Sequence, residues 1–143
     1  MTNVRFHFNV ADRTDYTCRL LRKAVRQGAR VAVSGPAATL AGLDRALWTF
    51  DATDFVPHVL LASGQTLPQR LGATPVYLVE RTADAPAREV LVNLGAETPV
   101  GFEAFERVVE IVSTAEADRV AARQRWREYA ALGLTIERHE AGL

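Results

Sequence analysis

The sequence predicts a three-layer α/β/α fold with a mostly parallel sheet, formed by a single domain over residues 1–143. Strand-type and helix-type segments alternate along the chain, as they do in proteins with parallel sheets. The length of 143 residues is that of one domain and suffices to bury a core without a disulfide or metal. Hydrophobic residues make up 48% and charged residues 24%, an ordinary globular composition.

The first half of the chain contains three predicted strands and two predicted helices. They are a strand over residues 4–10, a helix over 12–27, a strand over 30–34, a helix from Pro36 to about Trp48, and a strand over 58–62. Asp12 or Thr14 can cap the first helix, and Gly28 can end it. The second helix carries three leucines at helical spacing, which predict its buried face.

The second half repeats the alternation with shorter elements. Its predicted elements are strands over residues 76–80, 90–94 and 107–112, a helical turn over 102–105, a helix over 115–132 and an edge strand over 134–136. Thr114 can cap the last helix, and Gly133 can end it. The glycines and proline of residues 63–73 predict an exposed connection between strands.

The charge balance argues against direct contact with nucleic acid or an anionic membrane. Seventeen Lys and Arg residues balance seventeen Asp and Glu residues, so the basic excess that such partners favour is missing. The sequence has no signal-peptide pattern and no apolar run of the ~18 residues that a membrane span needs, which predicts the cytoplasm. The single cysteine, Cys18, excludes an internal disulfide.

The motifs of nucleotide and metal chemistry are missing from the sequence. The turns at residues 9–12 and 34–39 match neither the dinucleotide fingerprint nor the phosphate loop, so we expect a nucleotide-binding-like topology without a phosphate loop. His7, His58 and His139 have no metal-binding spacing. We therefore predict no catalytic, cofactor or metal residues. A small nucleotide-dependent enzyme with unusual loops remains the competing interpretation.

Large aromatic residues cluster around the end of the second helix. Trp48 and Phe50 close this helix, and Phe55 and Pro57 follow in the next loop. Aromatic residues at the ends of elements often anchor protein interfaces. The alternative is a small core cluster beneath the loop.

The last helix places arginines beside a tryptophan. Arg119, Arg123, Trp126 and Arg127 are spaced to lie along one side, where they could clamp an acidic peptide. Arg125 lies about 200° around the helix from Arg123 and should be off this side. Alternatively, Trp126 is part of the buried face and the arginines are solvated. In a further alternative, the tryptophan and arginines bind single-stranded DNA directly.

The aromatic residues at the end of the second helix, followed by the arginines and tryptophan of the last helix, make the chain similar to the chi subunit of bacterial DNA polymerase III. The segments that carry the resemblance are residues 43–48 (LDRALW), 55–58 (FVPH), 88–94 (REVLVNL), 105–112 (FERVVEIV), 122–129 (ARQRWREY) and 132–133 (LG). It covers essentially the whole chain. The resemblance implies a non-catalytic accessory subunit without cofactors that binds the psi subunit and the acidic C-terminal tail of single-stranded DNA-binding protein. It also implies contact with a repair-related helicase in some bacteria, and only indirect contact with DNA.

The resemblance also implies site residues. The psi-facing surface carries over to Trp48, Phe55, Val56 and Pro57. The tail-binding surface carries over to four residues of the C-terminal third, which are Val112, Arg119, Arg123 and Trp126. Two of these differ from the family pattern, because a lysine is replaced by Arg119 and a tyrosine by Trp126. Both replacements retain the charge or the aromatic area.

We expect the chain not to bind nucleotides, because neither early strand is followed by a glycine-rich phosphate loop. Isothermal titration calorimetry with millimolar ATP, GTP and NAD tests this expectation. A saturable dissociation constant below ~100 μM, or roughly 5.5 kcal/mol of binding free energy, would contradict it.

Overall fold

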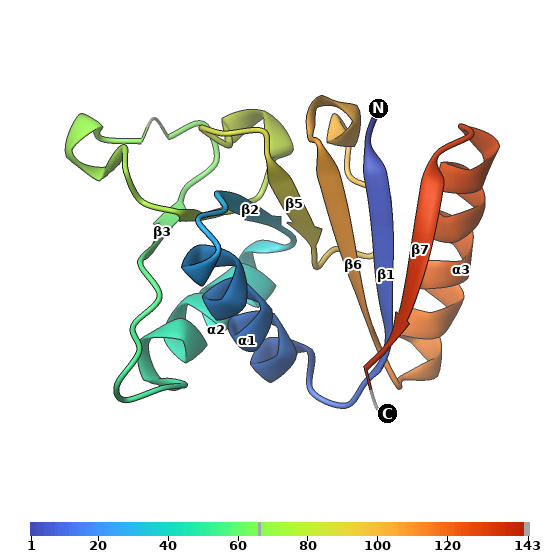
Figure 1. Ribbon diagram of the computed structural model, residues 1–143, viewed down its shortest axis with the longest axis horizontal. Coiled ribbons are helices and arrows are strands. Elements are labelled where there is room, and N and C mark those ends of the chain that lie inside the picture. Colours follow the sequence, from blue (N-terminus) through green and yellow to red (C-terminus); the bar gives the residue numbers. More distant parts are fainter. Residues whose placement is uncertain (66, 142–143) are drawn as a thin grey trace.

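Seven strands form one sheet in the computed structural model, which describes residues 1–65 and 67–141 (Figure 1). The elements are β1 (Asn3–Val10), α1 (Arg13–Arg26), β2 (Val31–Ser34), α2 (Ala37–Thr49), β3 (His58–Leu61), η1 (Gln69–Leu71), β4 (Val76–Val79), η2 (Thr82–Asp84), β5 (Val90–Asn93), η3 (Phe102–Ala104), β6 (Arg107–Ser113), α3 (Glu116–Ala131) and β7 (Thr135–Glu140). The strand order is β3-β4-β2-β5-β6-β1-β7. Every pairing between these strands is parallel, so the sheet is more regular than the mostly parallel one expected.

The helices cover both faces of the sheet and confirm the three-layer prediction. Helices α1 and α2 pack on one face over the half that contains β2, and α3 lies on the other face beside β7 (Figure 1). Successive strand residues alternate between the two cores, so Val31 and Val33 meet α1 and α2 while Ala32 faces the opposite core. No helix within the described residues is long and apolar enough to cross a bilayer.

The helix ends follow local side-chain chemistry. Asp12 caps α1 by accepting a hydrogen bond from the backbone N–H of Asp15 at 3.1 Å, as the sequence predicts. The predicted cap of α3 is wrong, because Thr114 lies one residue before the capping position, which Ala115 occupies. No side-chain hydrogen bond caps α3, and Ser113 Oγ instead accepts from the N–H of Ala115 at 3.2 Å, in the turn before the helix begins. Gly133 follows α3 with a φ of 75°, a left-handed conformation that suits glycine.

The last strand is longer than the sequence indicates. The expected edge strand over residues 134–136 is β7, which continues to Glu140 and pairs with β1 along its whole length. An edge strand hydrogen-bonds on one side only, and most of the β7 side chains are exposed. The apolar alternation that identifies a buried strand is therefore too weak here to show where it ends.

A buried ion pair joins α3 to the sheet. Glu110 of β6 is fully buried, and its carboxylate accepts from Arg125 Nε at 2.9 Å and Tyr129 OH at 2.7 Å. Asn93 of β5 donates to both carboxylate oxygens at 3.1 Å. Burial raises the pKa of Glu110, and the positive charge of Arg125 opposes this shift. Arg125 does lie off the side of Arg123, as predicted, but it is buried rather than solvated.

We expect Arg125→Ala to lower the free energy of unfolding by about 3–5 kcal/mol, because it leaves the Glu110 charge buried without its partner. Urea denaturation followed by circular dichroism measures this loss. The control is Arg127→Ala on the exposed side of the same helix, which should change stability by less than ~0.5 kcal/mol. Equal effects of the two substitutions would show that the pair does not hold α3.

Candidate protein-binding surfaces

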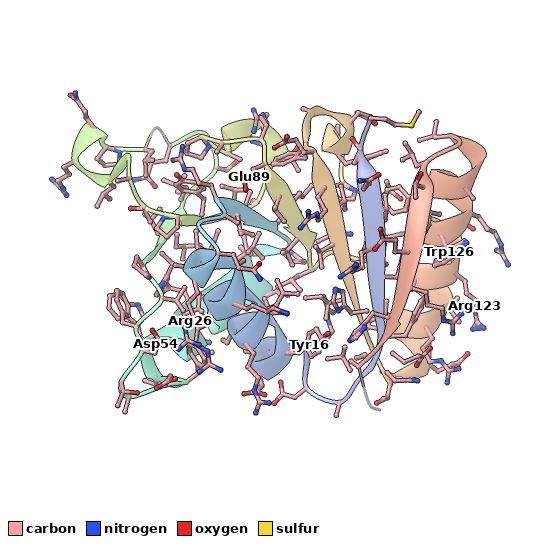
Figure 2. The ribbon with its side chains drawn as sticks, viewed as in Figure 1. Tyr16, Arg26, Asp54, Glu89, Arg123 and Trp126 are labelled. Atoms are coloured by element: carbon pink, nitrogen blue, oxygen red, sulfur yellow. The ribbon has the colours of Figure 1, made fainter. Side chains whose placement is uncertain are left out.

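A groove of about 300 Å³ lies between the last helix and the last strand, and we call it the α3–β7 groove. Its lining residues come from three elements and are Phe8, Asn9, Arg119, Ala122, Arg123, Trp126, Arg138 and Glu140. The structure thus brings together three of the four residues expected to bind an acidic tail. Figure 2 labels Arg123 and Trp126 on α3, at the end of the molecule away from α1 and α2.

The floor of the groove is aromatic. Trp126 is partly buried, and its ring lies 5.0 Å from that of Phe6 and 6.2 Å from that of Phe8, measured between centroids. Phe6 and Phe8 are two residues apart on β1, so both side chains face α3 and stack with centroids 5.6 Å apart. Trp126 is therefore neither fully in the core nor free in solvent. One part of the indole packs on β1, and another part lines the groove.

Three guanidinium groups surround this apolar floor. Arg119 and Arg123 are exposed on α3, one turn apart. Arg123 Nη2 lies 3.2 Å from the Glu116 carboxylate, a pair that is too exposed to hold the guanidinium firmly. Arg138 of β7 supplies the third group, which lies over the Phe8 ring at 4.7 Å from its centroid. The groove thus combines apolar area with carboxylate-binding groups.

Two of the groove's features correct the sequence interpretation. Val112, expected to line the tail site, is only 1% exposed and belongs to the core cluster on which Trp126 packs. It therefore supports the groove from below and makes no surface of its own. Two further lining residues, Phe8 and Arg138, cannot be recognised from sequence spacing because they lie more than a hundred residues apart. Only the parallel pairing of β1 with β7, in which Phe8 lies beside Glu140, brings them together.

A second surface consists of the aromatic cluster formed by Trp48, Phe55 and His58. Trp48 is 60% exposed and Phe55 is 51% exposed, and their rings stack with centroids 5.0 Å apart. The His58 ring lies 5.0 Å from Trp48, edge to face. Large aromatic side chains that are this exposed and in mutual contact are typical of an interface anchor. The alternative of a core cluster beneath the loop does not fit their exposure.

The loop that carries Phe55 is held to α1 by charge. Arg22 donates to Asp51 at 2.6 Å, and Arg26 pairs with Asp54 as Figure 2 shows. Asp51 also accepts from the backbone N–H of Thr53 at 2.9 Å, and this bond is the main reason for its lowered pKa. These contacts tie the loop that carries Phe55 to α1.

The two other residues expected on this surface differ in exposure. Val56 is 1% exposed and packs in the core with α1 and α2, whereas the neighbouring Pro57 is exposed. Val56 therefore anchors the loop, and only Pro57 can extend the aromatic surface. The expected partner-facing set of four residues contains three exposed ones.

A third hollow, of about 900 Å³, lies where α/β proteins often bind ligands, at the carboxyl ends of β2, β4 and β5. Several of its polar side chains form hydrogen bonds with other groups of the protein. Arg88 donates to the carbonyls of Thr82 and Ala85 at 2.7 and 2.8 Å, and Asn93 is bonded within the Glu110 network. Within the described ranges, no group of three or more potential metal ligands was found.

His7 has a structural partner. Its Nδ1 lies 2.5 Å from the Tyr16 hydroxyl, and its ring is edge-on to that of His139 at 5.2 Å. Burial, followed by the charges of His139 and Arg5, lowers the pKa of His7 to about 4. The ring is therefore neutral at physiological pH and satisfied by the tyrosine.

The two candidate surfaces lie at opposite edges of the sheet. The aromatic cluster includes His58 of β3, and the α3–β7 groove includes Arg138 of β7, and these strands are the two edges. In Figure 2, Asp54 beside the aromatic cluster and Trp126 in the groove are at opposite ends of the molecule. These features define an all-parallel α/β/α protein with a separate exposed surface at each edge of its sheet.

Comparison with known proteins identifies the family within this class. Residues 1–137 match the family model described as DNA polymerase III chi subunit, HolC, so the chain belongs to the DNA polymerase III chi subunit family. It is 33% identical to the DNA polymerase III subunit chi of Pseudomonas aeruginosa, over 97% of this chain and 96% of that protein. It is 28% identical to the chi subunit of Escherichia coli, over 83% and 79% of the two chains. The chi subunit of Haemophilus influenzae is 26% identical over 90% and 87%.

Proposed function

We propose that the chain is a non-catalytic accessory subunit of bacterial DNA polymerase III that connects two partners. It binds the psi subunit through the aromatic cluster and the acidic C-terminal tail of single-stranded DNA-binding protein through the α3–β7 groove. Its contact with DNA is indirect, and its place of action is the cytoplasm. The similarity of the whole chain to chi subunits supports this role.

The groove is the observation that carries the tail-binding part of the proposal. A tail with acidic side chains and a terminal carboxylate needs guanidinium donors, which can hold a carboxylate through two parallel hydrogen bonds. Arg119, Arg123 and Arg138 provide them around one hollow. The apolar residue at the end of the tail needs a shallow apolar site, which Trp126 and Phe8 provide.

The exposure of the groove sets the strength of binding. Burying one apolar side chain contributes roughly 1.5–3 kcal/mol, and each exposed ion pair adds at most ~1 kcal/mol. A micromolar complex needs about 8 kcal/mol. A single tail should therefore bind weakly to moderately and in a salt-sensitive way. Several tails presented by one oligomeric coat protein would raise the overall affinity.

The exposure of the aromatic cluster supports the psi part. Trp48 and Phe55 present a large, rigid apolar area, and the ion pairs of the loop fix it in place. Anchors of this kind are enriched in the energetic centres of interfaces. Pro57 is next to Phe55 and extends the same surface. We also propose the aromatic cluster as the binding surface for a repair-related helicase, in bacteria where such a helicase binds chi.

Arg123→Glu should weaken binding of an acidic C-terminal peptide at least about fivefold, because it reverses one of the charges of an ion pair. Fluorescence anisotropy with the labelled peptide measures the affinity. Raising the salt concentration should weaken binding by screening, and amidation of the terminal carboxylate should weaken it by removing an acceptor. Arg70→Glu, on the exposed turn η1, changes the net charge equally and is the control.

If salt does not affect peptide binding, and Arg123→Glu and Arg70→Glu bind the peptide equally, the tail-binding proposal is wrong. Competition by an unrelated single-stranded oligonucleotide, at the same concentration as the unlabelled peptide, would instead favour the direct DNA binder. Trp126→Phe tests the aromatic floor, because it retains packing on Phe6 and Phe8 but reduces the area in the groove. We expect it to lower peptide affinity with little change in melting temperature.

Trp48→Ala and Phe55→Ala should each weaken the complex with psi about 30-fold or more, the effect of losing roughly 2 kcal/mol at a central anchor. Tail binding should be retained, since the groove shares no residue with the aromatic cluster. Calorimetry with purified psi measures the first property, and peptide anisotropy measures the second. The matched control is Leu132→Ala, an apolar residue that is 59% exposed just after α3. A comparable loss of psi binding in this control, or loss of tail binding in the Trp48 variant, would refute two separate surfaces.

A further inference from the structure

Strand β7 forms the second wall of the α3–β7 groove, opposite the helix. Arg138 lies on the face of β7 that looks toward α3, because it is two residues after Ile136, which packs in the same core as Tyr129. Its side chain is 64% exposed, and its guanidinium covers the Phe8 ring. The group is thus positioned by the aromatic floor and remains accessible to a ligand. Its charge adds to those of Arg119 and Arg123 across the hollow.

An acidic side chain of the protein already occupies part of this wall. Glu140 Oε1 accepts from Arg138 Nη2 at 2.9 Å and from Arg138 Nε at 3.2 Å. Its other oxygen accepts from Asn9 Nδ2. Asn9 has a φ of 58° at the register shift of β1, and is the one non-glycine residue with positive φ within the described ranges. Glu140 therefore lies among the arginines that line the groove, and its carboxylate accepts hydrogen bonds from the Nε and Nη2 groups of Arg138.

We propose that Arg138 and Glu140 form an affinity-setting pair in the groove, an inference that rests on the proposed binding of an acidic peptide there. Arg138 binds a carboxylate of the peptide from the strand side. Glu140 competes for the same guanidinium and repels the peptide's negative charge, and so weakens binding. The groove then holds its ligand less tightly than its three arginines would allow. Release of the tail is correspondingly faster, because differences in affinity at one interface arise mostly in the dissociation rate.

The opposite face of the same strand offers matched controls. Glu137 of β7 pairs with Arg5 of β1 at 2.5 Å, and both side chains are half exposed. Glu137 and Glu140 are three positions apart and so lie on opposite faces of the sheet. The groove is lined by Glu140 and Arg138, and neither Glu137 nor Arg5 is part of its lining. Glu137→Gln and Glu140→Gln each remove one negative charge from β7, but only Glu140 lines the groove.

The test uses the full-length protein and a labelled acidic peptide that ends in an apolar residue with a free carboxylate. Glu140→Gln should tighten binding about two- to fivefold and slow dissociation, because an exposed charge pair contributes up to about fivefold. Arg138→Ala should weaken binding about fivefold or more, since it also leaves Glu140 without its partner. Glu137→Gln and Arg5→Ala should leave the affinity at the wild-type value. A misfolded Glu140→Gln variant would lose affinity, so misfolding cannot explain the expected increase in peptide affinity. If Arg138→Ala is unstable, Arg138→Lys is used in its place, because it retains the charge but loses the guanidinium.

The possible outcomes separate this inference from the function on which it rests. If the wild type binds and Arg123→Glu weakens binding, but the Arg138 and Glu140 variants bind like the wild type, the β7 pair is not part of the site and the inference fails alone. The inference also fails if Glu137→Gln tightens binding as much as Glu140→Gln, because general charge would then explain the effect. If the wild type does not bind the peptide at all, the proposed tail binding fails and the inference fails with it.

Discussion

The buried pair between Glu110 and Arg125 determines which side of α3 faces the solvent. A carboxylate at the centre of a sheet must be paired, since an isolated buried charge costs several kcal/mol. Arg125 can reach Glu110 only if its side of α3 lies against the sheet. This rotation leaves Arg119 and Arg123 outside. The same side chain donates to the carbonyl of Ala96 at 2.8 Å, so the pair also holds the loop after β5.

Most of the fold follows from local patterns, and the exceptions have physical reasons. Apolar periodicity predicts the bounds of the buried strands and of α2 within one or two residues. The three leucines that predict the buried face of α2, Leu40, Leu43 and Leu47, are all buried. The end of β7 could not be predicted, since an edge strand has no apolar alternation. Thr114 has the residue type of a helix cap, but Ala115 takes the capping position and α3 begins without a side-chain cap. Strand order depends on crossovers between distant segments, which no local pattern contains.

The candidate site could be predicted only where its residues share one element. Arg119, Arg123 and Trp126 are at helical spacing on α3, so the sequence alone brings them together. Phe8 and Arg138 join them through strand pairing, which sequence spacing does not report. Burial was the other hidden property. An arginine in a helix is usually solvated, so the sequence does not indicate that Arg125 has a buried partner. It also does not indicate that Val112 is buried in the core rather than exposed in the site.

The position of β1 in the sheet has a consequence for the order in which the protein is made. Among the strands that the structure describes, this first strand pairs with β6 and β7 alone, which begin at Arg107 and Thr135. A chain that emerges from the ribosome N-terminus first must therefore keep β1 unpaired until most of the translation is complete. The elements that carry the aromatic cluster are all synthesised by Leu61, but the groove needs both ends of the chain. A chain that ends before β7 thus lacks the strand wall of the groove, which Arg138 and Glu140 form.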